Sequence, residues 1–126
     1  MREIKFRGKR LDNGEWLYGS LLISHFKDDK KERYFITQFS GNYTFEHEVD
    51  PNTVGQYTTK CDRMQCEVYE DDIVRDELGS IGVVIFIEGA FAVDFGEGIE
   101  LQELNTDVLA VCEIIGNRFD NPELLK

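Results

Sequence analysis

Hydrophobic and polar positions alternate with a period of two along most of this chain. Ile4 and Phe6 alternate with charged neighbours over residues 3–7, and the segments 34–39 and 43–49 alternate in the same way. A period of two sends successive side chains to opposite faces of a strand, so each segment predicts a half-buried β-strand. No long segment shows a helical period, and the pattern therefore predicts a mainly β protein.

Turn-forming residues separate the predicted strands of the first half. Asp12-Asn13-Gly14 precedes a strand over residues 16–23, and Ser40-Gly41-Asn42 lies between two of the alternating segments. Asn and Gly accept the positive φ of tight turns, so both sites predict β-hairpins. The run 27–32 contains no apolar residue and predicts an exposed loop.

The second half continues the β pattern around one strongly apolar segment. Residues 83–87 are apolar on both faces, as expected for a buried central strand. Glu88-Gly89 then turns the chain into residues 90–95, which predicts another hairpin. Residues 68–74 and 108–115 are also rich in β-forming residues and predict further strands.

These elements predict two small antiparallel β subdomains within a single domain spanning residues 1–126. The first subdomain covers residues 1–50, the second covers 61–126, and residues 51–60 connect them. Because a small sheet protects its edges by curling, we expect the second subdomain to form an SH3-like barrel. Asn121-Pro122-Glu123 predicts a short C-terminal helical turn, since proline fits the first turn of a helix.

Composition and charge narrow the functional classes. Hydrophobic residues make up 41% of the 126 residues, which is enough to bury a stable core. The net charge of −11 is uneven, with +3 over residues 1–33 and −14 over residues 34–126. Such a field repels a phosphate backbone and argues against direct nucleic-acid binding.

Three cysteines are the candidate metal ligands. Cys61, Cys66 and Cys112 are an odd number without a secretory signal, which indicates reduced thiols and a cytoplasmic location. Structural zinc takes four ligands, usually with closer pair spacing, so we expect no metal and no other cofactor. No apolar stretch has the length needed to span a bilayer, so we expect no membrane partner.

An acidic cluster is the candidate for catalytic chemistry. Several carboxylates can hold a hard cation or divide acid and base roles. In a strand, however, Glu70 and Asp72 share one face while Asp71 points to the other, so only part of the cluster converges. We therefore expect these carboxylates to lie on a solvated strand edge. We expect none of them to be catalytic, and we expect that the protein is not an enzyme. The cluster comprises Glu67, Glu70, Asp71, Asp72, Asp76 and Glu77.

Several blocks of the chain resemble the phage and prophage YopX family, in the family's order. The chain departs from the family at Asp71, where a glycine is usual, and at residues 61–66, where the family has a polar turn rich in lysine, asparagine and glycine. The resemblance implies a mainly β phage-type protein with no established reaction, so no catalytic residue is carried over. The matching blocks are Met1–Lys9, Gly14–Gly19, Val54–Thr58, Val68–Val74, Gly82–Phe91 and Ile115–Leu125.

Three functions from different classes remain open. The first is a non-enzymatic phage or prophage accessory protein that acts by contact with an unidentified protein of phage or host. The second is an acidic DNA mimic that inhibits a host nucleic-acid enzyme, which requires one continuous acidic face. The third is a small metal-dependent hydrolase, which requires a bound metal.

Aromatic residues near the connection between the subdomains form the candidate interaction surface. Aromatic side chains dominate interface energetics, and the alternative is that Trp16 and Tyr57 hold the two halves together as core. As a surface, Tyr69→Ala or Asp72→Ala should leave the protein folded and abolish binding. We also expect a homo-oligomer, because symmetric assembly covers sheet edges and aromatic faces. The candidate surface comprises Trp16, Tyr18, Gln56, Tyr57, Tyr69 and Asp72.

Overall fold

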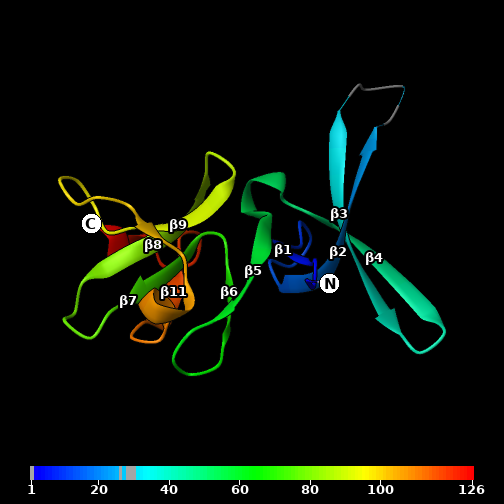
Figure 1. Cartoon of the computed structure of the whole chain (residues 1–126). Helices are drawn as coiled ribbons and strands as arrows, with labels where there is room; N and C mark the ends of the chain where they lie inside the picture. The colour runs from blue at the N-terminus through cyan, green and yellow to red at the C-terminus, as the bar shows by residue number, and fades with distance from the viewer. Residues whose placement is uncertain (1, 26, 28–30) are drawn as a thin grey trace. The chain divides into compact units, whose positions relative to one another are not determined.

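The computed structural model describes residues 2–25, 27 and 31–126. The chain divides into two compact units, Met1–Gln56 and Tyr57–Lys126, and the division lies within the connection expected at residues 51–60. Each unit consists mainly of antiparallel strands (Figure 1). The mainly β fold predicted from the alternation is therefore confirmed.

The first unit is an antiparallel sheet with the strand order β4–β3–β2–β1–β5. Its first strand begins at Phe6, later than the strand predicted over residues 3–7. The last strand of the unit, β5, continues into the second unit. The elements are β1 (Phe6–Lys9), β2 (Trp16–His25), β3 (Glu32–Ser40), β4 (Tyr43–Val49), the 3-10 turn η1 (Pro51–Thr53) and the first part of β5 (Gly55–Cys61).

Two successive hairpins connect β2, β3 and β4 (Figure 1). Ser40 pairs with Tyr43 across the second turn, where Gly41 has a φ of +60°. This left-handed conformation suits glycine, so the hairpin predicted from the Ser-Gly-Asn sequence is confirmed. The exposed loop predicted over 27–32 includes residues 28–30, which lie outside the described residues.

The core of the first unit lies on one face of β2, β3 and β4. Leu17, Ile36 and Val49 are buried there. Val49 also packs against β1, because a Cβ on Gly8 would lie 2.9 Å from Val49 Cγ2. A backbone bridge between Arg10 and Val49 brings the end of β1 to the end of β4. The partly buried residues around this core are Phe6, Leu21, Tyr34 and Val54.

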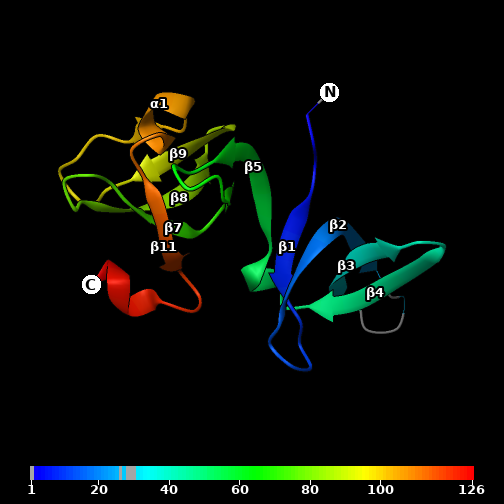
Figure 2. The ribbon, with the colours of Figure 1, turned by 90° about the horizontal axis from the view of Figure 1, so that it is seen from below.

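The second unit contains a five-stranded sheet with the order β10–β9–β8–β7–β11. β8 is the central strand and forms a hairpin with β9, as the apolar run and the Glu-Gly turn predict. Figure 2 shows α1 just before β11 and η2 just after it. The elements are the rest of β5, β6 (Glu67–Tyr69), β7 (Asp72–Arg75), β8 (Ile81–Ile87), β9 (Ala90–Asp94), β10 (Gln102–Glu103), α1 (Thr106–Leu109), β11 (Glu113–Asn117) and η2 (Pro122–Leu125).

This sheet is not closed into a barrel. β10 and β11 are its outer strands, and no ladder joins them in the described part of the chain. With only two residues, β10 is too short to form a long closing ladder. The SH3-like barrel expected for this region is therefore not confirmed. The short C-terminal helical turn is confirmed as η2.

Two segments of the second unit depart from the strands predicted for them. Residues 68–74 form two strands instead of one, because Asp71 turns the backbone with a φ of +75°. Glycine adopts that conformation without strain, so the backbone here suits the glycine that the resemblance implies at this position. Of the strand predicted over residues 108–115, only the last part forms, in β11. Residues 106–109 form a helical turn, and the Asn105 side chain caps it by accepting the N–H of Val108 at 2.9 Å.

Candidate functional site

Three of the six candidate surface residues are buried in the second unit. Tyr57, Tyr69 and Asp72 are 7%, 2% and 2% exposed. The two tyrosines are partners across the β5–β6 ladder, with ring centroids 5.4 Å apart. The Asp72 carboxylate accepts the backbone N–H of Tyr69 at 2.7 Å and so holds the β6–β7 turn. These side chains therefore offer a partner little surface.

The other three candidate surface residues lie in the first unit. Trp16 is half-buried beside two cations of β1, with Arg7 Cζ 4.8 Å and Lys9 Nζ 5.7 Å from its ring centroid. Gln56 in β5 is also half-buried, whereas Tyr18 in β2 is exposed. A role in binding stays a prediction for these residues.

Tyr18 belongs to a larger apolar face, defined as the outer face by Tyr18, Leu22, Phe35 and Phe39. Leu22 pairs directly with Phe35 across the β2–β3 ladder. The other two residues lie four positions away on the same strands, so the period of two places all four on one side. Tyr18, Leu22 and Phe39 are 46%, 44% and 72% exposed. The last three members were not among the residues predicted from the sequence, although the alternation of β2 and β3 contains them.

The loop between Cys61 and Cys66 is a hairpin turn organised by a buried carboxylate. Asp62 accepts the N–H groups of Met64 and Cys66, each at 2.9 Å, through Oδ1. Its Oδ2 accepts the N–H of Ile114 in β11 at 2.9 Å. One carboxylate therefore shapes the turn and also attaches it to β11.

The same turn recurs between β7 and β8, around Asp76. Its Oδ1 accepts the N–H groups of Leu78 at 2.9 Å and Ser80 at 2.8 Å. Gly79 has a φ of +86° in this turn, and Gln65 has a φ of +64° at the equivalent position of the first turn. The two turns therefore share the same carboxylate contacts, and Gln65 adopts in the first turn the left-handed conformation that Gly79 adopts in the second.

The predicted acidic cluster does not converge on one site. Asp72 and Asp76 accept backbone N–H groups of their own turns. Asp71 Oδ1 lies 3.6 Å from Arg118 Nε, in an ion pair. Across the described residues, no group of three His, Cys, Asp or Glu side chains is placed to hold a metal ion.

The three cysteines have different environments. Cys66 is exposed, Cys61 is half-buried and Cys112 is fully buried. Burial raises the pKa of the Cys112 thiol, and the negative charges of Asp76 and Asp62 raise it further. Because the thiolate is the reactive form and a buried thiol is poorly accessible, we expect Cys112 to be the least reactive of the three in the folded protein.

We expect an alkylating reagent to modify Cys66 first and Cys112 last in the folded protein. Timed alkylation followed by peptide mass spectrometry measures the three rates separately. The control is the same reaction in denaturant, where the three rates should become similar. Modification of folded Cys112 as fast as Cys66 would contradict this assignment.

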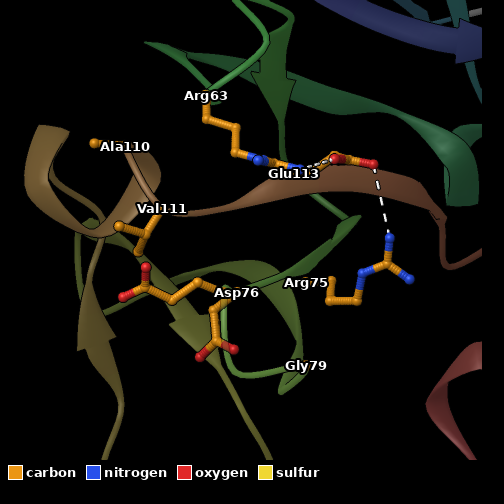
Figure 3. A pocket seen from close by; sticks show the side chains of 8 residues that line it. Arg63, Arg75, Asp76, Gly79, Ala110, Val111 and Glu113 are labelled. Atoms are coloured by element: carbon orange, nitrogen blue, oxygen red, sulfur yellow. Dashed lines mark hydrogen bonds and ion pairs between the residues drawn. The ribbon is translucent and has the colours of Figure 1, made fainter.

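A polar pocket of about 430 Å³ lies beside β11 in the second unit. The Glu113 carboxylate is placed between two guanidinium groups, with Oε2 2.5 Å from Arg63 Nη2 and Oε1 3.8 Å from Arg75 Nη2 (Figure 3). Asp76 lies on another side of the pocket. An incoming anion would compete with Glu113 for both arginines, so this arrangement favours a structural salt bridge.

Comparison with known proteins identifies the family. The family model described as YopX protein matches residues 5–126. The chain belongs to the YopX family. Among solved structures, the YopX-family chain is similar to protein EF1440 from Enterococcus faecalis, with a TM-score of 0.66, 20% identity and 100% of both chains covered. At this identity the likeness shows the fold alone. The comparison with curated proteins gives no match.

The last block that resembles other YopX proteins forms a compact polar loop. Asn117 Oδ1 accepts the N–H groups of Phe119 at 3.0 Å and Asp120 at 2.9 Å. Asn121 Oδ1 accepts the N–H of Asn117 at 3.2 Å and would lie only 2.4 Å from a Cβ on Gly116, so a larger residue there would clash. The block therefore has a structural explanation. Of the helices formed by the described residues, none is long and apolar enough to cross a membrane.

Proposed function

We propose that this YopX-family protein is a non-enzymatic phage-type accessory protein that acts by binding another protein in the cytoplasm. The observation that supports this proposal is the outer face of the first unit. Tyr18, Leu22 and Phe39 expose large apolar side chains on one side of two paired strands. Contiguous apolar patches on a soluble protein often mark interaction sites.

The surroundings of the outer face indicate the chemistry of the partner. Phe35 pairs with Glu48, and Thr37 pairs with Glu46, so β4 adds carboxylates beside the apolar residues on the same face. Protein interfaces commonly combine an apolar centre with a polar rim. The matching partner is a protein of phage or host with an apolar patch bordered by lysine or arginine.

We expect the double variant Leu22→Ser/Phe39→Ser to remain folded and to lose partner binding by tenfold or more. Both side chains are exposed, so the loss of unfolding free energy should be about 1 kcal/mol or less. Removing two apolar contacts from an interface centre has a larger effect on binding. Affinity capture from host cells, quantified by mass spectrometry, compares the partners of the variant and the unchanged protein.

The matched control is Leu78→Ser in the second unit, where Leu78 is 88% exposed. This control should retain every partner that the unchanged protein captures. Retention of the same partner by the double variant would refute a role for the outer face. The DNA-mimic and metal-dependent hydrolase alternatives stay predictions, and turnover of a substrate by the purified protein would overturn the non-enzyme proposal.

A further inference from the structure

We infer that two copies of this chain associate through the edge strand β4, which pairs antiparallel with the β4 strand of the second copy. β4 is the outer strand of its sheet and has a ladder with β3 on one side. The edge contact differs from the outer face, and its two-fold symmetry follows from pairing one strand with itself.

Backbone contacts at the end of β4 show which edge groups point outward. The Glu48 carbonyl accepts the N–H of Leu11 at 3.1 Å, so the backbone N–H and C=O groups of Glu48 point away from β3. Successive residues of an antiparallel strand direct their N–H and C=O groups to alternate sides. The backbone N–H and C=O groups of Thr44 and Glu46 therefore also point outward, along the part of the edge that Leu11 does not cover. Such a row of groups is a template for another strand.

One register satisfies these groups with favourable side-chain pairs. With the two-fold axis at Phe45, Thr44 of each copy forms a hydrogen-bonded pair with Glu46 of the other. Phe45 then faces Phe45 of the second copy, and Tyr43 faces His47 of the second copy. The side chains of Tyr43, Phe45 and His47 all lie on one face, because positions 43, 45 and 47 alternate with 44 and 46.

The neighbouring registers are less favourable. Centring the axis on Glu46 sets two Glu46 carboxylates against each other and requires the Glu48 carbonyl that Leu11 already uses. Centring it on Thr44 pairs Glu46 with Asn42, which belongs to the hairpin turn. The register centred on Phe45 avoids both problems.

Exposed aromatic surface supports a second copy as the occupant of this edge. Tyr43 is 72% exposed and Phe45 is 48% exposed. Ile23 is also exposed on this face of the sheet, which is the face of Leu21. Pairing brings the aromatic residues of both copies together across the axis, and aromatic cross-strand pairs stabilise antiparallel sheets.

The first test measures the mass of the full chain by sedimentation equilibrium up to about 100 µM, where even a weak contact is populated. We expect a dimer, and we expect Glu46→Pro to weaken its association at least tenfold. Proline removes an outward N–H without removing a β3 ladder bond, so circular dichroism should show a folded variant. A monomer at every concentration, or unchanged association of Glu46→Pro, would overturn the inference.

Cysteine crosslinking tests the register even if Glu46→Pro does not fold. In a Cys66→Ser background, Phe45→Cys should form an intermolecular disulfide on mild oxidation, because residues of a directly opposed non-hydrogen-bonded pair lie within disulfide range. Glu46→Cys is the control and should crosslink at least tenfold more slowly. Equal rates would overturn the register. The outer-face variant Leu22→Ser/Phe39→Ser should still dimerise. Failure of the proposed function can therefore be distinguished from failure of this dimer.

Discussion

Asp62→Ala is expected to lower the free energy of unfolding of the second unit by about 3–5 kcal/mol. The buried Asp62 carboxylate accepts three backbone N–H groups, two in its own turn and one from Ile114 in β11. Alanine removes all three hydrogen bonds and leaves the Ile114 N–H without its acceptor. The loss is large because hydrogen bonds to a charged acceptor are stronger than neutral ones.

Asp76→Ala is the matched control for this turn. Its carboxylate accepts two N–H groups of an exposed turn and, among the described residues, none from another strand. We expect a loss of about 1 kcal/mol, as for other exposed caps. Urea denaturation followed by circular dichroism measures both variants, and hydrogen exchange assigns the loss to the second unit. Equal losses for the two variants would show that the bond to β11 contributes nothing.

Tyr69→Ala is expected to lower the free energy of unfolding by about 3–5 kcal/mol, since truncating a buried aromatic residue leaves a cavity. The side chain is almost fully buried and packs against Tyr57. This expectation replaces the mild effect that a surface position would have. Chemical denaturation measures the loss, and an unchanged midpoint would contradict the assignment of Tyr69 to the core.

Tyr18→Ala removes the same side chain from an exposed position and is the control for Tyr69→Ala. We expect it to change the free energy of unfolding by about 0.5 kcal/mol or less. The pair also guides the binding experiments. If a Tyr69 variant lost a partner, the cause could be unfolding or a missing contact. Substitutions on the outer face leave the fold intact and so test the contact alone.

Part of the candidate site was within reach of sequence reasoning. Tyr18 is both aromatic and exposed, and its alternation with Leu17 and Gly19 is visible in the sequence. Tyr69 and Asp72 have the same residue types as an interface pair, yet they are buried. Burial depends on which strands cover a face, and a residue type alone does not contain that information.

The sequence by itself determined several hairpins, the central strand and the family of this protein. The hairpins at Gly41 and Gly89 follow from residues that accept a positive φ, and the central strand β8 follows from an apolar run. These features depend on neighbours within a few positions, where backbone sterics and side-chain alternation act directly.

Only the tertiary structure decided the features that join distant segments. The Asp62 carboxylate accepts the N–H of Ile114, which lies 52 positions along the chain, and this contact attaches the turn after β5 to β11. The open sheet of the second unit likewise depends on the pairing of its outer strands. Such contacts are set by the packing of whole strands, and the local pattern of a segment does not specify its distant partner.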